Sequence, residues 1–198
     1  SGDGDTSAIG LGNFCHMMRR NVNITYIIEN NGVYGLTKGQ FSATADVGSV
    51  MKGGKVNDIP AIDMAELAIT LGATYVARSF SGDRKQLTPL IQGALAHSGS
   101  AILDVISPCV TFNNHEGSTK SLKYAKGHLD PIHDIDFIPP YENIEADYDE
   151  GTDHAVELHD GSHIILHKLS KDYDPLNKMQ AISAINAAIT EGTFLTRL

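Results

Sequence analysis

The sequence contains no tryptophan, only two cysteines and no long apolar run. Cys15 and Cys109 are too few and too far apart for a disulfide scaffold or a self-contained metal knuckle. No apolar stretch approaches the roughly 20 residues of a membrane-spanning helix. The first residues also lack the basic and apolar regions of a signal peptide. These absences predict a soluble, cytoplasmic protein that does not insert into a membrane.

Basic residues are also scarce: 15 Lys and Arg stand against 24 Asp and Glu, which gives a formal net charge of -9. The basic residues are scattered singly, so the chain lacks the positive patch that binds a phosphate backbone. Nucleic acid is therefore not an expected partner. With 198 residues, of which 41% are hydrophobic, the chain can build one core of ordinary size.

Strand and helix patterns alternate through the first half of the chain. Apolar residues at helical spacing predict a helix over Thr6–Arg20, with Thr6 or Ser7 as its cap. The run "NITYII" predicts a buried strand that ends in the turn formers "ENNG". The pattern then repeats, with helices expected over residues 62–71 and 84–97 and strands over 73–79 and 101–106. This series predicts an α/β fold with a doubly wound, mostly parallel sheet.

The last third of the chain has a different character. Residues 126–151 are polar, acidic and contain proline, which is typical of a long surface loop. Asp160 and Gly161 lie between two alternating runs and predict a hairpin turn, and Asn177–Thr190 predicts a closing helix. We therefore divide the chain into an α/β domain over residues 1–125 and a C-terminal extension over 126–198.

The opening "SGDGD" has the composition of a turn whose backbone amides face a phosphate at the carboxyl edge of a sheet. It matches neither the dinucleotide motif GxGxxG nor a Walker loop. An acidic residue within a phosphate loop needs a reason, and the simplest is Mg²⁺, which joins a carboxylate to phosphate oxygens. Asp3 is then a predicted metal ligand.

A second oxygen ligand is expected from a neighbouring strand end. Asn31, in "ENNGVYG", follows Asp3 after one helix and one strand, which return the chain to the same edge of the sheet. The Asn31 side chain and a backbone carbonyl of the next turn can complete the ligands that the protein supplies, with diphosphate and water filling the remaining positions.

These motifs resemble a known family. "GDG" followed by "NN" is similar to the signature of thiamine diphosphate enzymes. The longer strings "GDGD", "RRNVNITYI", "NNGVYGLTKGQ" and "SPCVTFNN" resemble the beta subunit of 2-oxoacid:ferredoxin oxidoreductases. The resemblance implies the C-terminal, thiamine-diphosphate-binding part of that subunit, without its N-terminal strand and upstream region. "HEGSTKS" is most similar to the 2-oxoglutarate branch.

The resemblance implies an enzyme that converts a 2-oxoacid and coenzyme A to acyl-coenzyme A and CO₂ and passes electrons through an iron–sulfur cluster to ferredoxin. Its expected partners are an alpha subunit and ferredoxin. Asp3, the Asn31 side chain and the Val33 carbonyl are the implied Mg²⁺ ligands. The implied contacts to the cofactor itself come from Gly4, Asp5, Gly35 and Leu36.

Three further residues acquire roles only through the resemblance. Cys109 matches the fourth cysteine ligand of a [4Fe–4S] cluster, whose other three ligands belong to the upstream region. Lys38 and Lys85 resemble basic positions near coenzyme A and the substrate. The aminopyrimidine ring of the cofactor is expected to be held by a partner subunit along the face formed by residues 3–6 and 31–40, so this chain alone should be inactive.

Plainer interpretations remain for several of these residues. Cys15 falls within the apolar spacing of the first helix and is expected to be a buried small hydrophobe, and Cys109 could be the same. Lys38 and Lys85 could be solvated, and "GDGD" could be an ordinary turn. The histidines are expected at the surface rather than in an acid–base or metal site: His115 beside Glu116, and His159 with His163.

Two other functions also remain open at this point. One is a different thiamine enzyme, either a pyruvate-type oxidoreductase or a decarboxylase that does not use ferredoxin. The other is a non-catalytic α/β module that binds a partner subunit.

Overall fold

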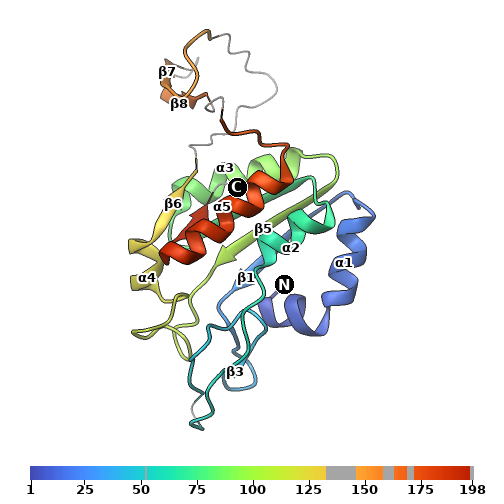
Figure 1. The fold of residues 1–198 in the computed structure, drawn as a ribbon, viewed down its shortest axis with the longest axis vertical. Coiled ribbons are helices and arrows are strands. Elements are labelled where there is room, and N and C mark those ends of the chain that lie inside the picture. Colours follow the sequence, from blue (N-terminus) through green and yellow to red (C-terminus); the bar gives the residue numbers. More distant parts are fainter. Residues whose placement is uncertain (52, 133–145, 158–162, 169–171, 197–198) are drawn as a thin grey trace.

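A computed structural model describes residues 1–51, 53–132, 146–157, 163–168 and 172–196. Its centre is a parallel sheet with the strand order β1-β5-β4 (Figure 1). The bounds are Ile24–Asn30 for β1, Tyr75–Phe80 for β4 and Ser100–Ile106 for β5. The predicted α/β fold and the parallel sheet are therefore confirmed.

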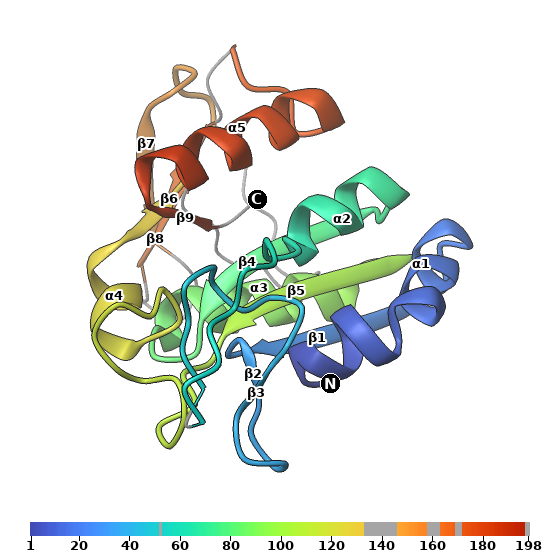
Figure 2. The same ribbon diagram turned by 60° about the horizontal axis from the view of Figure 1, so that its bottom comes forward.

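Helices cover both faces of this sheet (Figure 2). Helices α1 (Leu11–Arg19) and α2 (Met64–Leu71) pack on one face, where Phe14, Met64 and Ile102 belong to the same buried cluster. Helix α3 (Arg84–Ala96) packs on the other face against Leu103. Successive residues of β5 thus point to opposite layers, as the two-residue period of a strand requires.

Helices α2 and α3 begin at aspartates that cap them, and α2 ends at a glycine. The Asp63 carboxylate accepts the Glu66 backbone N–H and begins α2, and Asp83 does the same for α3 through the Gln86 N–H. Gly72 ends α2 in the left-handed region, at φ +94°. These caps satisfy backbone groups that a helix end leaves without a partner.

The single helix predicted over residues 6–20 is wrong in detail. The structure has a π-helical turn, η1 (Asp5–Ile9), and a separate helix α1. Helical backbone already begins at Asp3, so Thr6 and Ser7 lie inside the helix and do not cap it. Their hydroxyls instead donate to the carbonyls four residues earlier, Thr6 at 3.0 Å and Ser7 at 2.5 Å.

The first predicted strand is longer than expected. β1 continues two residues beyond Ile28, so Asn30 is its last residue instead of part of a turn. Next to β1, Gly2 forms a parallel bridge with Glu29, and the Glu29 N–H donates to the Ser1 carbonyl at 2.9 Å. Residues 1 and 2 therefore lie beside β1 in the position of a neighbouring strand.

The C-terminal third adds short elements around the sheet. Helix α4 (Leu122–Gly127) and the parallel pair β6 (Leu129–Pro131) and β9 (Phe194–Thr196) were not predicted. The predicted hairpin is confirmed in its strands, β7 (Asp153–Glu157) and β8 (His163–His167), and the closing helix is α5 (Lys178–Glu191). The expected turn at Asp160 and Gly161, His159, and residues 133–145 of the acidic loop lie outside the described residues.

Helix α5 packs on α2, with Ile185 and Ala188 against Ile69. Helix α4 spans residues 125 and 126, where the sequence suggested a boundary, and the division into two parts stays a prediction. None of the described helices is both long enough and apolar enough to cross a membrane.

Candidate cofactor and metal site

Asp3 lies at the carboxyl edge of the sheet, with a side chain that is only 1% exposed. Its Oδ1 accepts the Asn31 backbone N–H at 3.2 Å, and its Oδ2 accepts the Gly32 N–H at 3.1 Å. Two hydroxyls also contact Oδ2: that of Thr44, at 2.6 Å, and that of Ser42. The structure therefore brings together Asp3 and Asn31, as the spacing in the sequence predicted.

The Asp3 carboxylate has only neutral donors around it. Within the described part of the chain, no Lys, Arg or His lies within ion-pair distance of it. A buried charge is costly unless an opposite charge or a metal compensates it. Of the two oxygens, Oδ2 has three donors whereas Oδ1 has one among these residues, so Oδ1 retains a lone pair for a further partner.

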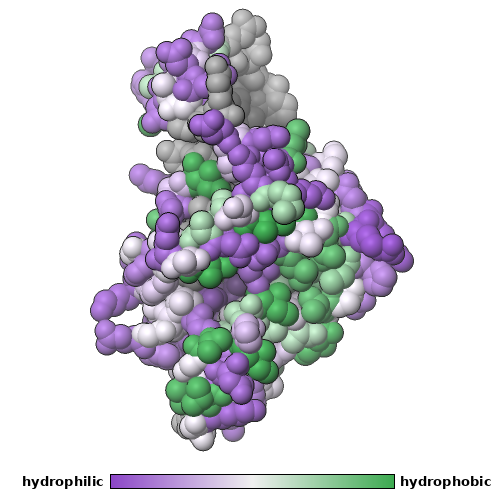
Figure 3. Space-filling model, in the orientation of Figure 1, coloured by the Kyte–Doolittle hydropathy of each residue, from purple (hydrophilic) through white to green (hydrophobic). Residues whose placement is uncertain are grey.

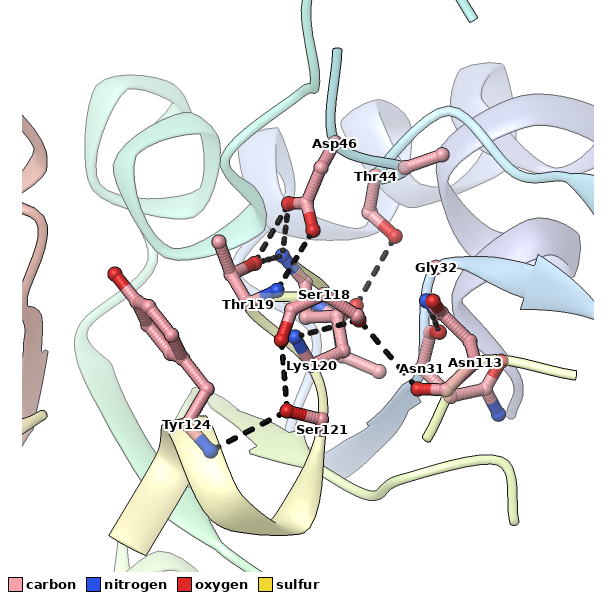
Figure 4. Close-up of polar contacts among 12 residues, drawn as sticks. Asn31, Gly32, Thr44, Asp46, Asn113, Ser118, Thr119, Lys120, Ser121 and Tyr124 are labelled. Atoms are coloured by element: carbon pink, nitrogen blue, oxygen red, sulfur yellow. Dashed lines mark hydrogen bonds and ion pairs between the residues drawn. The ribbon is translucent and has the colours of Figure 1, made fainter. Parts of the chain in front are cut away.

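The turn after β1 carries the second predicted oxygen ligand, the Asn31 side chain, and the backbone N–H of the same residue contacts Asp3. The Asn31 Oδ1 accepts the Val33 backbone N–H at 3.1 Å, which folds the side chain over its own turn. Gly32 adopts φ +77°, a conformation that favours glycine. Asn113 Nδ2 donates to the Asn31 carbonyl at 2.7 Å and holds the turn from outside (Figure 4).

Strand β2 (Val33–Tyr34) pairs with β3 (Gln40–Phe41) and leads the chain back over the opening loop. The Tyr34 hydroxyl donates to the Gly4 carbonyl at 2.8 Å. A Cβ at Gly4 would lie 2.5 Å from the Tyr34 ring, so any larger residue there would require the ring or the loop to move. Burial, with help from Asp5 and Asp3, raises the pKa of Tyr34, so its hydroxyl stays a donor.

These residues fit a magnesium ion. Asp3 Oδ1 and Asn31 Oδ1 are the kind of hard oxygen donors that Mg²⁺ takes, and the buried carboxylate has no cationic side chain beside it in the described part of the chain. The glycine at position 4 keeps the loop backbone uncovered by a side chain of its own. The structure is thus compatible with the predicted ligands, whereas the metal and the cofactor contacts themselves stay predictions.

The remaining predicted site residues are spread over the same edge. Leu36 is fully exposed, and Lys38 is exposed with φ +82° in the turn between β2 and β3. Cys109 is half-buried beside this turn, since a Cβ built on Gly35 would lie 3.7 Å from its Sγ. Lys85 is exposed in the first turn of α3, and no described contact joins it to the other residues.

The plainer interpretations have mixed outcomes. Cys15 is half-buried, so the expected full burial is wrong. Its neighbours Phe14 and Met18 fill the core side of α1 instead. His115 and His163 are exposed, as expected. Among the described residues, no group of three or more His, Cys, Asp or Glu could hold a metal.

Sequence reasoning missed the polar network beneath Asp3. The Thr44 hydroxyl lies 3.0 Å from Asn30 Oδ1, and Asn30 Nδ2 donates to Asp104 Oδ1 at 2.9 Å. Arg78 then pairs with Asp104 Oδ2 at 2.9 Å and with Asp63 at 2.5 Å. The sequence did contain a sign of this network. An aspartate within an apolar strand such as "AILDVI" indicates a buried carboxylate, and a buried carboxylate requires a hydrogen-bond or ion-pair partner.

A second group of contacts fastens the "HEGSTKS" segment to the loop after β3. Asp46 accepts the backbone N–H and the hydroxyl of Thr119, and the Lys120 amino group lies 3.3 Å from it (Figure 4). Burial and the Asp46 carboxylate together raise the pKa of nearby Tyr124. A cavity of about 370 Å³ opens here, lined among others by Asn30, Thr44, Asp46, Arg78, Lys120 and Tyr124.

Residues 1–105 match the sequence profile of the C-terminal TPP-binding domain of thiamine pyrophosphate enzymes. The match includes the Asp3 loop, the Asn31 turn, strands β1 and β4, and β5 except for its last residue. The chain belongs to the thiamine pyrophosphate enzyme family. Thiamine pyrophosphate is another name for the thiamine diphosphate of the predicted signature, so this part of the prediction is confirmed.

Individual relatives give a finer comparison. The chain is 47% identical over 114 residues to a 2-oxoacid:ferredoxin oxidoreductase subunit beta of Saccharolobus solfataricus, which covers 57% of this chain and 37% of that protein. It is also 38% identical over 124 residues to the 2-oxoglutarate oxidoreductase subunit KorB of Mycobacterium tuberculosis. This alignment covers 62% of this chain and 33% of that protein. The chain thus spans less than half the length of these relatives.

Among solved structures, the fold is similar to a 2-oxoglutarate:ferredoxin oxidoreductase from Magnetococcus marinus with 2-oxoglutarate, coenzyme A and succinyl-CoA bound. The TM-score is 0.61 at 28% identity, over 96% of this chain and 60% of that chain. The predicted resemblance to beta subunits of 2-oxoacid:ferredoxin oxidoreductases is confirmed by these relatives.

Proposed function

We propose that this thiamine pyrophosphate enzyme domain works within the beta subunit of a 2-oxoacid:ferredoxin oxidoreductase that prefers 2-oxoglutarate. The reaction joins the 2-oxoacid and coenzyme A into acyl-coenzyme A with loss of CO₂, and the electrons released pass singly to oxidised ferredoxin. The observation that carries this proposal is the buried Asp3 carboxylate, which is held next to Asn31 and has no cationic side chain of the described residues within ion-pair distance.

In this proposal, Asp3 Oδ1, Asn31 Oδ1 and the Val33 carbonyl hold Mg²⁺, and Gly4, Asp5, Gly35 and Leu36 face thiamine diphosphate. Bound thiamine diphosphate supplies the electron sink on which a 2-oxoacid can lose CO₂. The chain's own contribution is placement: the Asn31 turn is braced by Asn113, and the Gly4 carbonyl is held by Tyr34. A rigid cradle of this kind lowers the entropic cost of bringing reactants together.

The preference for 2-oxoglutarate is supported by the relatives. KorB of Mycobacterium tuberculosis is named for 2-oxoglutarate, and the Magnetococcus marinus enzyme was solved with that substrate. Lys38 and Lys85 are both exposed, so their ammonium groups can meet a substrate carboxylate or a coenzyme A phosphate. We propose these contacts for the two lysines, with Lys38 the better candidate because it shares a turn with Leu36.

The proposed iron–sulfur cluster requires more cysteines than this chain contains. A [4Fe–4S] cluster takes four thiolates, whereas Cys15 and Cys109 are the chain's two cysteines. We propose that Cys109 supplies one ligand. Its position beside Gly35 supports this proposal, because a cluster there would adjoin the face assigned to the cofactor.

The same face is proposed to meet the alpha subunit. Leu36 is fully exposed on the turn between β2 and β3, and Val47 and Ile59 are exposed on the loop after β3. Figure 3 shows apolar surface at the lower end of the molecule, where this loop lies in Figure 1. Exposed apolar patches commonly mark protein interfaces.

Cofactor titration of the assembled enzyme tests the proposal. Calorimetry with thiamine diphosphate should show Mg²⁺-dependent binding that Asp3→Ala and Asn31→Ala abolish, because each removes the side-chain oxygen of a proposed metal ligand. Asn186→Ala, on the exposed side of α5, is the control and should bind as the wild type does. Wild-type affinity in both site variants would contradict the assignment. Comparing 2-oxoglutarate with pyruvate as substrates, with ferredoxin as acceptor, then tests the substrate preference.

A further inference from the structure

Two hydroxyl side chains converge on one oxygen of Asp3. Ser42 and Thr44 follow strand β3 and are 5% and 1% exposed. The Thr44 hydroxyl lies 2.6 Å from Asp3 Oδ2, and the Ser42 hydroxyl donates to the same atom. With the Gly32 N–H at 3.1 Å, Oδ2 is surrounded by donors, whereas Oδ1 has the Asn31 N–H alone within the described residues.

The two hydroxyls are themselves held in place. They lie 2.9 Å apart, and the Thr44 backbone N–H donates to the Ser42 hydroxyl at 3.2 Å. Beyond Thr44, the chain of contacts continues through Asn30 to Asp104, which the Arg78 ion pair anchors in the sheet. The side of the Asp3 carboxylate that faces Ser42 and Thr44 is therefore tied to the rigid centre of the fold.

We propose that Ser42 and Thr44 are positioning residues for the metal: they hold Asp3 Oδ2 so that Oδ1 is presented as a single-oxygen ligand beside Asn31. This inference rests on the proposed function, because it assumes that Asp3 binds Mg²⁺. Mg²⁺ demands near-ideal octahedral geometry, so a carboxylate that can rotate is a poor ligand for it. Partners of a ligating carboxylate typically change metal affinity by about 10–100-fold when removed.

Two backbone hydrogen bonds of the loop remain when the hydroxyls are removed, and Thr44→Val also keeps the bond from the Thr44 N–H to the Ser42 hydroxyl. The Ser42 backbone N–H donates to the Gly32 carbonyl at 3.1 Å, and the Ala45 N–H donates to the Ser42 carbonyl at 3.2 Å. Neither bond involves a side chain. Thr44→Val keeps the shape of the side chain and deletes its hydroxyl, whereas Thr44→Ser keeps the hydroxyl.

The test is direct titration of metal into the assembled enzyme, freed of divalent ions by a chelator and supplied with thiamine diphosphate, by calorimetry with Mg²⁺ and separately with Ca²⁺. Ser42→Ala and Thr44→Val should weaken Mg²⁺ binding about 10–100-fold, and Thr44→Ser should bind nearly as the wild type does. Ca²⁺ tolerates flexible geometry, so its affinity should fall less, and the ratio of Mg²⁺ to Ca²⁺ affinity should drop.

Ser79→Ala is the matched control, because Ser79 is also a buried hydroxyl but donates to Gln86 at 2.7 Å, away from Asp3. It should leave both affinities unchanged. Wild-type Mg²⁺ affinity in Ser42→Ala and Thr44→Val would overturn the inference and leave the proposed function intact, and so would an equal loss of Mg²⁺ and Ca²⁺ affinity. A wild-type enzyme that binds no Mg²⁺ with thiamine diphosphate would overturn the proposed function as well.

Discussion

Arg78 and Asp104 are register partners on the parallel strands β4 and β5, with the Arg78 Nε 2.9 Å from Asp104 Oδ2. Both side chains are almost fully buried, at 4% and 1% exposure. The same guanidinium reaches Asp63 at the start of α2, at 2.5 Å. One arginine therefore joins two strands of the sheet to a helix. Through Asp104 it is also connected to the hydrogen-bond network that ends at Asp3.

Removal of this arginine should be strongly destabilising. Arg78→Met removes the ion-pair partner of the buried Asp104 and of the partly buried Asp63, and we expect a loss of about 3–5 kcal/mol in the free energy of unfolding, measured in urea. Lys123→Met is the control, since the Lys123 ammonium is highly exposed and lies 3.9 Å from Glu116. It should cause no measurable change. An equally small effect of Arg78→Met would show that the buried ion pairs contribute little.

The same cluster predicts an acid-dependent stability. Burial by itself would raise the pKa of Asp63, but Arg78 and the Glu66 backbone N–H bring it below the ordinary value. A carboxyl with a lowered pKa stabilises the fold above the pKa of the unfolded chain, about 4, and this stability is lost as the pH falls through the folded pKa. Urea midpoints measured from pH 7 down to pH 3 should therefore fall less steeply for Asp63→Asn than for the wild type. Parallel curves for the two proteins would refute this role.

Gly4 should not tolerate a side chain. In Gly4→Ala the new Cβ would lie 2.5 Å from the Tyr34 ring, so the loop or the ring must move. We expect a loss of about 1–3 kcal/mol, as for an overpacked core, together with weaker binding of thiamine diphosphate in calorimetry. Gly12→Ala is the control, because nothing lies within 4 Å of the added Cβ and the residue is in helix α1. This variant should gain up to about 1 kcal/mol.

Cys109 and Cys15 should differ in their effect on iron. In the assembled enzyme, Cys109→Ser should lower the iron content and abolish the reduction of ferredoxin. Thiamine diphosphate should still bind, because Cys109 is not one of the proposed Mg²⁺ ligands. Cys15→Ser, a change on helix α1, should leave the iron content at the wild-type level. Unchanged iron in Cys109→Ser would make this cysteine a structural residue.

Much of this protein could be predicted from local patterns. The alternation of short β-branched runs with helical spacing predicted the parallel sheet, because a strand and a helix each follow from residues close in sequence. The spacing of Asp3 and Asn31 placed both at one edge, since every parallel strand ends on the same side. "GDGD", followed at this spacing by "NNGVYGLTKGQ" and "SPC", predicted the family through its resemblance to known members.

Other features were decided by the tertiary structure. The sequence by itself determined that Asp3 lies between two glycines near the start of the chain. The contacts of its Oδ2 with Ser42 and Thr44, about forty positions away, form because strands β2 and β3 bring the chain back. Nothing local in "FSATAD" indicates that pairing, because a hydroxyl forms hydrogen bonds with whatever the fold puts beside it. The break of the first helix at Gly10 was likewise not indicated by the helical spacing of the apolar residues. The Arg78 network forms only once β4, β5 and α2 pack together.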